Sequence, residues 1–257
     1  MCKLAVVITG INVGKGMTRL IIFLCCIPSF GFAAGNERIA SFSYAKRLLM
    51  QEVYHDHRTT LYCDATFSEH KAITPLKGFV TAKYKKRAKK VEWEHVVPAE
   101  NFGRTFRAWR DGDEQCVTRK GVVFKGRRCA EKVDQAYRLM QSDLYNLFPA
   151  IGAVNARRSN YNFVASVDGN REFGSCGVKI ARNKVEPPVS ARGRIARTYL
   201  YMQDTYPRYK MGKPQAKLMQ AWDRLYPVSE WECQRARRIG TIQGNPNRIM
   251  TARCGLK

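Results

Sequence analysis

Acidic residues are scarce in this sequence. Its 257 residues include 21 aspartates and glutamates against 45 lysines and arginines, which gives a formal net charge of +24. Such an excess makes a folded chain repel itself, unless its partner is a polyanion such as nucleic acid, an anionic membrane or an acidic glycan. Hydrophobic residues make up 45% of the chain, which is too apolar for a disordered basic tail. The length excludes a peptide hormone or mini-scaffold and favours one or two folded domains.

The sequence also lacks a hydrophobic run long enough to span a membrane. The apolar run from Leu20 to Pro28 is about half the ~20 residues that a spanning helix needs. Met17-Thr18-Arg19 adds a positive charge before the run, and Gly31-Phe32-Ala33 provides small residues for signal-peptidase cleavage. We therefore predict a signal peptide at residues 1–33, with 1–16 as an upstream extension, and a folded domain at 34–257. Loss of Lys3, Lys15 and Arg19 with the signal would reduce the charge from +24 to +21.

Outside the predicted signal peptide, closely spaced cysteine pairs are missing, which argues against a structural zinc site. No C-x-x-C pair occurs, and three of the nine cysteines fall within the predicted signal peptide. The six that remain suit three disulfides in an oxidising compartment, with fifteen connectivities open: Cys63, Cys116, Cys129, Cys176, Cys233 and Cys254. The glycine and β-branched residues of 121–126 indicate a small hairpin that Cys116 and Cys129 could close.

Apolar periodicity predicts a helix at the start of the folded region. Ser43 can cap this helix, whose apolar residues recur at 3.6-residue spacing as far as Val53. Glycines, short β-branched runs and charges alternate over residues 77–130, as in strands and long loops. A second helix is predicted from Asp134 to Leu147, stopped by Pro149.

The C-terminal third is predicted to consist of three helices. Ser190 can cap the first, and Pro214 suits the first turn of the second, which Pro227 ends. Ser229 and Glu232 form a capping box at the start of the third. No repeat or linker divides the chain, so a single mixed α+β domain is expected.

Histidines are few, and one of the four has an unusual setting. His95 lies in the apolar segment Val91 to Pro98 and directly follows Glu94. Alternation along a strand would place Glu94 and His95 on opposite faces, so that one could hold a cation while the other handles a proton. A buried histidine with a structural role is the alternative.

A basic segment immediately precedes this motif. Six of the eight residues from Lys83 to Lys90 are lysine or arginine. Beside a candidate acid–base site, in a strongly basic domain, this segment is expected to bind phosphates; a solvated loop is the alternative. Further arginines follow in the predicted C-terminal helices, at positions 192, 194, 197, 235, 237 and 238.

Several longer motifs resemble those of the bacterial endonuclease I family, the periplasmic and secreted nucleases of the ββα-metal (His-Me finger) class. They occur in the same order over nearly all of residues 34–257. They are Val91 to Ala99, Ser142 to Leu147, Val154-Asn155, Arg158-Ser159-Asn160, Glu186-Pro187-Pro188, Arg192 to Tyr199 and Tyr226 to Cys233. The resemblance implies a ββα-metal core surrounded by helices.

The resemblance also implies a reaction and its residues. His95 would be the general base, and Glu94 and Asn146 would hold a magnesium ion (Mg2+), for which manganese (Mn2+) can substitute. The protein would be an exported, monomeric, sequence-nonspecific endonuclease of DNA and RNA that leaves 5′-phosphate ends. Whether an inhibitor partner exists is left open by the sequence. A non-catalytic basic protein that binds nucleic acid or anionic surfaces is the alternative. The residues expected to contact phosphate are Lys85, Lys86, Arg87, Lys89, Lys90, Arg158, Arg192 and Arg197.

Two features stay open after this comparison of motifs. The family uses an arginine to stabilise the transition state, but the segment between Trp109 and Cys129 is longer here than in relatives, so Arg110, Arg119, Arg127 and Arg128 are all candidates. For the disulfides, proximity favours Cys116 with Cys129, and a position beside the C-terminal helices favours Cys233 with Cys254. Cys63 with Cys176 then remains.

Overall fold

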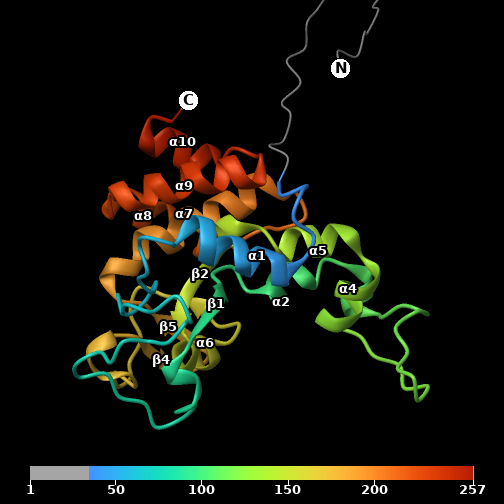
Figure 1. Cartoon of the computed structure of the whole chain (residues 1–257), viewed down its shortest axis with the longest axis horizontal. Coiled ribbons are helices and arrows are strands. Elements are labelled where there is room, and N and C mark those ends of the chain that lie inside the picture. The colour runs from blue at the N-terminus through green and yellow to red at the C-terminus, as the bar shows by residue number, and fades with distance from the viewer. Residues whose placement is uncertain (1–34, 257) are drawn as a thin grey trace, which may run out of the picture. The chain divides into compact units, whose positions relative to one another are not determined.

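A short two-stranded ribbon and the helix that follows it occupy the middle of the domain (Figure 1). The computed structural model describes residues 35–256, so the predicted signal peptide and its cleavage site lie outside the described residues. β1 (Val91–His95) pairs antiparallel with β2 (Leu147–Ile151), and His95 lies opposite Leu147. The chain passes directly from β2 into α6 (Gly152–Arg158), which packs against both strands.

The ribbon forms in spite of a proline in its second strand. All five residues of β2 are buried, and Pro149 lies opposite Trp93. A proline is tolerated in a two-stranded ribbon because the missing N–H can face outward, and the Pro149 carbonyl still accepts a hydrogen bond from Leu61 N at 2.8 Å. At the start of α6, a Cβ on Gly152 would lie 2.6 Å from the Arg87 carbonyl oxygen, so only glycine fits this close approach.

A second, three-stranded sheet follows α6 in the chain. Its strands are β3 (Asn162–Phe163), β4 (Lys179–Ala181) and β5 (Lys184–Glu186), in the order β3-β5-β4. Arg182 and Asn183 form the tight turn between β4 and β5, and both have positive φ angles, 48° and 59°. The turn therefore presents two polar side chains at the end of the sheet.

Long helices make up the C-terminal third, as predicted. They are α7 (Val189–Thr205), α8 (Lys213–Leu225), α9 (Glu230–Gln243) and α10 (Arg248–Cys254). α7 packs against α8, and both lie with α9 and α10 in the upper part of Figure 1, above β1 and β2. Their apolar residues, such as Ile195, Tyr199 and Trp222, are buried in one continuous core with β1 and β2. The molecule is thus a mixed α+β domain, mostly helical with small sheets.

Short helices form the rest of the domain. α1 (Phe42–Leu48) continues into a π-helical turn at Leu49–Val53. α2 (Ala99–Gly103) and α3 (Arg107–Arg110) follow β1, and α4 (Arg127–Val133) and α5 (Gln135–Gln141) precede β2. The loop between α3 and α4 reaches away from the other elements in Figure 1. The bridge between Val117 and Val123 confirms a small hairpin within this loop.

Three predicted helix boundaries were wrong. The side chain that caps α1 is Ser41, which accepts from Tyr44 N, rather than Ser43. The helix predicted from Asp134 to Leu147 begins after Asp134, which caps α5, but it ends at Gln141. A 3-10 turn at Leu144–Asn146 follows, and residues 147–151 pair with β1 as β2. Ser190 lies inside α7, which begins after Pro188. By contrast, Ser229 caps α9 by accepting from Glu232 N at 3.2 Å.

Three disulfides join Cys63 with Cys176, Cys116 with Cys129, and Cys233 with Cys254. These are the expected pairings. The first links residues 113 positions apart and ties the segment before β1 to the segment before β4. The second closes the hairpin loop at the start of α4, and the third joins α9 to α10.

Candidate active site

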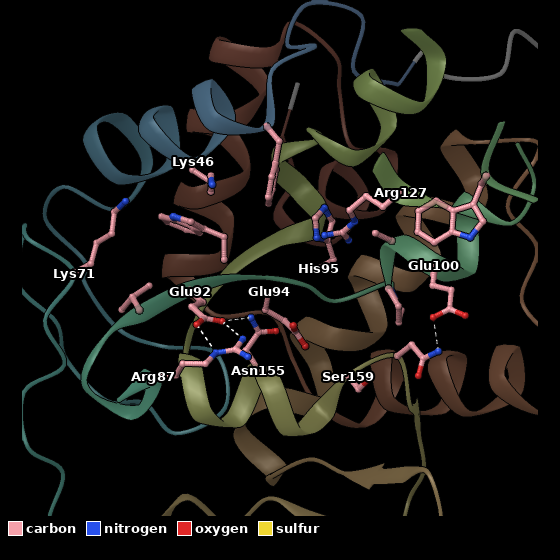
Figure 2. A pocket seen from close by; sticks show the side chains of 17 residues that line it. Lys46, Lys71, Arg87, Glu92, Glu94, His95, Glu100, Arg127, Asn155 and Ser159 are labelled. Atoms are coloured by element: carbon pink, nitrogen blue, oxygen red, sulfur yellow. Dashed lines mark hydrogen bonds and ion pairs between the residues drawn. The ribbon is translucent and has the colours of Figure 1, made fainter. Parts of the chain in front are cut away.

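A pocket of about 630 Å³ opens around β1 and contains the histidine motif (Figure 2). β1 supplies Glu92, Glu94 and His95 to its lining. α1, α2, α3, α4 and α6 contribute the remaining walls, together with the Lys71 loop and Arg87. The pocket therefore gathers residues from most of the chain around one strand.

His95 is held in a single orientation by its second ring nitrogen. Nε2 lies 2.8 Å from the carbonyl oxygen of Gln141, at the end of α5. A carbonyl can only accept, so Nε2 carries the proton and Nδ1 keeps its lone pair. The ring also stacks on Phe42, with centroids 5.0 Å apart. Burial, followed by the nearby charge of Arg127, lowers the pKa of His95 to about 3, which keeps the imidazole neutral near pH 7.

Glu94 is almost fully buried and is fixed through one of its two oxygens. Oε1 accepts from the Tyr62 hydroxyl at 2.7 Å and pairs with Arg158 Nη1 at 3.0 Å. Burial raises the pKa of Glu94, and the charge of Arg158 and the Tyr62 hydrogen bond oppose this shift. Within residues 35–256, no hydrogen bond or ion pair involves Oε2, which leaves that oxygen available to a ligand.

Arg158 holds both Glu94 and the end of β1 in position. Its guanidinium donates to the carbonyl oxygens of His95 at 2.8 Å and Val96 at 2.6 Å. Only 1% of its surface is exposed, and its planar group lies over the ring of Phe163. Arg158 was expected to contact phosphate. Its burial argues against this role, because its guanidinium faces the protein interior.

The structure brings Asn155, rather than Asn146, to the pocket. Asn146 is fully buried, with Oδ1 accepting from Val97 N at 2.8 Å and Nδ2 donating to Val97 O at 3.0 Å. It is not among the described residues that line the pocket. Asn155 on α6 does line it and lies between Glu92 and Glu94 in Figure 2. Its Nδ2 donates to Glu92 Oε2 at 2.8 Å, so its Oδ1 is left for another partner.

One of the four candidate arginines reaches the pocket. Arg127, at the start of α4, lines it and lies beside His95 in Figure 2. Arg128 instead stacks on Phe124, 4.2 Å from the ring centroid, and Arg110 donates to the Arg104 carbonyl oxygen. Neither Arg110, Arg119 nor Arg128 is among the described lining residues.

The residues predicted to bind phosphate fall into two groups. Arg87 lines the pocket and pairs with Glu92, and the neighbouring lysines Lys85, Lys86, Lys89 and Lys90 are exposed beside it. Arg192 and Arg197 lie elsewhere, because α7 directs them toward acids of the C-terminal third: Glu186 for Arg192, and Asp223 and Glu232 for Arg197. With Arg158, these two are therefore structural arginines rather than exposed phosphate contacts.

The donor atoms in the pocket suit a hard divalent cation. Glu94 Oε2 and Asn155 Oδ1 are a carboxylate and an amide oxygen, the ligand types that Mg2+ prefers while it keeps several waters. Over residues 35–256 there is no group of three or more His, Cys, Asp or Glu side chains suited to a metal.

The chain is similar to known proteins over most of its length. The family model for Endonuclease I matches residues 43–253. The chain belongs to the Endonuclease I family. It is 38% identical to the extracellular deoxyribonuclease of Aeromonas hydrophila over 93% of this chain and all of that protein. It is 37% identical to the periplasmic deoxyribonuclease of the same species, over 79% and 82% of the two chains. It is 35% identical to Endonuclease-1 of Buchnera aphidicola, over 82% and 81%.

Membership in the Endonuclease I family makes the protein an endonuclease, a hydrolase, and this family is typically metal-dependent. The alternative of a non-catalytic binding protein is thereby set aside. No helix of residues 35–256 has the length and hydrophobicity to cross a membrane.

Sequence reasoning missed Asn155 as a site residue, although Val154-Asn155 is one of the matching motifs. The signal was its position: Asn155 lies three residues into the helix that directly follows the partner strand of β1. Lys46, Lys71 and Trp109 also line the pocket without having been singled out. Their sequence neighbourhoods carry no motif, so only tertiary contacts identify them.

Proposed function

We propose that this protein is an exported, sequence-nonspecific endonuclease that hydrolyses phosphodiester bonds of DNA and RNA with a single Mg2+ and leaves 5′-phosphate ends. The observation that carries the proposal is the neutral, oriented His95. Its Nδ1 has no hydrogen-bond partner among residues 35–256, and it lies in a pocket that also holds carboxylate and amide oxygens. The names of the Aeromonas relatives, which are deoxyribonucleases, support DNA as the substrate.

His95 acts as the general base in this proposal. Its Nδ1 takes a proton from a water molecule, whose oxygen attacks phosphorus while the bond to the 3′ oxygen breaks. The 3′ oxygen leaves with the bonding electrons and takes up a proton from solvent. The Gln141 carbonyl oxygen stabilises the imidazolium that forms, through the Nε2–H hydrogen bond. The negative charge of a bound phosphodiester opposes the lowering of the pKa of His95 and brings the ring nearer to the range useful for proton transfer.

Glu94 and Asn155 are the residues that would hold the cation. When bound, Mg2+ neutralises charge that grows on the phosphate and on the leaving oxygen. Arg158 and Tyr62 keep Glu94 in place through Oε1, and Glu92 keeps Asn155 in place through Nδ2. Asn155 therefore replaces Asn146 in our assignment, while Asn146 fixes the backbone at Val97.

Arg127 is the transition-state arginine in this proposal. It lies beside His95 and, within residues 35–256, takes part in no ion pair. A fixed guanidinium at the pocket can stabilise the extra negative charge of the pentavalent phosphorus. Arg87 and the lysines of residues 83–90 would hold the flanking backbone without reading bases, which accounts for a lack of sequence preference.

Plasmid cleavage tests the assignment of the base and the ligands. His95→Ala should lose about 10²–10⁴-fold in turnover, and no metal concentration should restore it. Asn155→Ala should lose activity that returns in part at high Mg2+ or with Mn2+, because only a cation ligand is lost. Glu94→Gln should show the same rescue. EDTA should abolish cleavage by the wild-type protein.

Asn146→Ala is the matched control for Asn155→Ala. It should lower the denaturation midpoint through the lost Val97 hydrogen bonds, with no activity recovered by excess metal. Metal rescue of Asn146→Ala and not of Asn155→Ala would reverse our assignment. Cleaved ends that accept label from polynucleotide kinase only after phosphatase treatment would identify 5′-phosphates.

The site of action is the periplasm or the external medium. Three disulfides require an oxidising compartment, and the Aeromonas relatives are named for these two locations. We propose that residues 1–33 direct export and are removed, which N-terminal sequencing of the secreted protein checks. A monomer is expected, and sedimentation of the purified protein tests this.

A further inference from the structure

A second pocket of about 700 Å³ shares the α2 segment with the active-site pocket, since Ala99 and Glu100 line the active site and Asn101 and Arg104 line the second pocket. Its lining comes from β3, the turn between β4 and β5, Tyr199 of α7, the segment between α7 and α8, α8 and the end of α2. Four cationic side chains line it, Arg104, Arg182, Lys184 and Lys210, and no described acidic residue does. The pocket is therefore suited to an anionic ligand.

Three of these cations lack an acidic partner in the protein. Arg104 pairs with Glu100, one turn earlier in the chain. Arg182, Lys184 and Lys210 take part in no ion pair or side-chain hydrogen bond within residues 35–256. Arg182 also occupies a left-handed backbone position, at φ 48°, in the turn that carries it to the rim of the pocket. Their charges are left uncompensated around one cavity.

The start of α8 adds uncharged donors to the same pocket. The helix has 13 residues, and its N-cap, Gly212, offers no side chain to the first backbone N–H groups. Backbone N–H groups at a helix start favour an anion. Nearby, the Gln215 side-chain amide nitrogen is buried without a hydrogen-bond partner in the described chain, although Gln215 lines the pocket. An unsatisfied buried donor beside unpaired cations indicates a missing acceptor.

The two pockets are neighbours along two segments of the chain. Glu100, Ser159 and Asn160 line the active-site pocket, whereas Asn101, Arg104 and Asn162 line the second one. A hydrogen bond from Asn160 Nδ2 to Glu100 Oε2, 2.6 Å long and drawn in Figure 2, joins the two segments on the active-site side. Two residues of extended chain span at most about 7 Å. A strand of duplex DNA advances about 3.4 Å per nucleotide.

We propose that the second pocket binds the phosphate backbone of the substrate strand a few nucleotides from the scissile bond. The proposal rests on the proposed nuclease function. The strand crosses the Glu100–Asn160 bridge, and Lys184 and Lys210 neutralise phosphates beyond it. The same chemistry would accept a free phosphate or mononucleotide, so the experiment must separate a bound strand from a free anion.

The test compares a pocket variant with a control variant that loses the same charge. The pocket variant is Lys184→Gln/Lys210→Gln. The control is Lys217→Gln/Arg224→Gln, two exposed cations of α8 that line neither pocket. Each protein is assayed on long duplex DNA, on a series of shorter oligonucleotides and on bis(p-nitrophenyl) phosphate, which is too small to reach the second pocket.

For the pocket variant we expect KM on long DNA to rise about tenfold at physiological salt, with kcat unchanged. The slope of log K against log salt should shrink by about one for each lysine removed. The difference from wild type should disappear below a threshold oligonucleotide length and should be absent with the small phosphodiester. The control variant should match wild type in this length dependence.

Three results would overturn the proposal. Equal KM values for the pocket and control variants at every oligonucleotide length would show that the second pocket does not bind the substrate strand. Loss of binding to inorganic phosphate or a mononucleotide, with DNA kinetics unchanged, would assign the pocket to a free anion instead. A defect of the pocket variant that extends equally to the small phosphodiester would indicate damage to the active site. Failure of the wild-type protein to cleave any of these substrates would refute the proposed function itself.

Discussion

The basic segment at residues 83–90 and the arginines of α7 and α9 use similar charges in opposite ways. Lys85, Lys86, Lys89 and Lys90 are exposed at the edge of the active-site pocket. Arg197 and Arg235 are buried, with Arg197 bound to Glu232 and Asp223, and Arg235 donating to the Leu144 and Leu147 carbonyl oxygens. A count of cations therefore overstates the surface available to nucleic acid.

The two residue types account for part of this difference. The guanidinium group is planar, weakly hydrated and carries five donors, so it can be buried where several acceptors converge. The lysine ammonium is strongly hydrated and stays at the surface unless it is paired. Arg158 belongs with the buried group although it lies next to the active site, since its donors are used by Glu94 and the end of β1.

Arg158→Ala should give the largest loss of stability. The change leaves Glu94 buried without its cation, so we expect the free energy of unfolding to fall by about 3–5 kcal/mol. Urea denaturation measures this. Arg127→Ala is the control, because this pocket arginine has no ion pair within the described residues. It should keep stability within about 0.5 kcal/mol and instead lose about 10²–10³-fold in kcat. Equal stability of the two variants would contradict the distinction.

Arg197→Ala should be the next largest effect. Glu232 and Asp223 would lose a buried partner, although Arg253 still pairs with Asp223. We expect a loss of about 3 kcal/mol in unfolding free energy. Because Arg197 does not face the substrate pocket, the salt dependence of DNA binding should match that of wild type. If the folded variant showed a weaker salt dependence of DNA binding than wild type, Arg197 would be a phosphate contact after all.

Replacement of Lys85, Lys86, Lys89 and Lys90 by glutamine should change DNA binding and leave stability almost unchanged, the reverse of what is expected for Arg197→Ala. The denaturation midpoint should change little, since exposed side chains contribute within about 0.5 kcal/mol. The slope of log K against log salt should shrink by about one for each lysine that contacts phosphate. An unchanged slope would mean that these lysines form a solvated loop, the alternative raised by the sequence.

The smallest effect is expected from an exposed ion pair of α9. The hydrogen bond from Arg238 lowers the pKa of Asp56 from 3.8 to about 2. A lowered carboxyl pKa stabilises the fold above pH 3.8, and this contribution is lost as the pH falls from there through 2. Asp56→Asn should therefore be slightly less stable than wild type at pH 7, with the difference vanishing near pH 2. Thermal denaturation at several pH values measures it, and a constant difference would exclude this ion pair as the cause.

Capping residues, prolines and apolar periodicity predicted the helices well where a helix packs through apolar residues on one of its faces. α8 begins at Lys213, as Pro214 indicated, and Ser229 caps α9. The prediction failed after Gln141, because pairing with β1 determines the structure of residues 147–151 and Pro149 does not stop a helix there. The end of α5 matters for function, since the Gln141 carbonyl oxygen at this point orients His95.

The sequence alone determined the family motifs, the even number of cysteines outside the signal peptide, the basic charge and the placement of Glu94 next to His95. These features depend on residue identity and short-range spacing. Tertiary structure decided which asparagine, which arginine and which cations reach the pocket. Asn146 and Asn155 are equally polar in sequence, but the ribbon fixes one against Val97 while α6 presents the other beside Glu94. The physical reason is that a side chain is available to a ligand only when its partners and burial leave an atom free, and those partners come from distant parts of the chain.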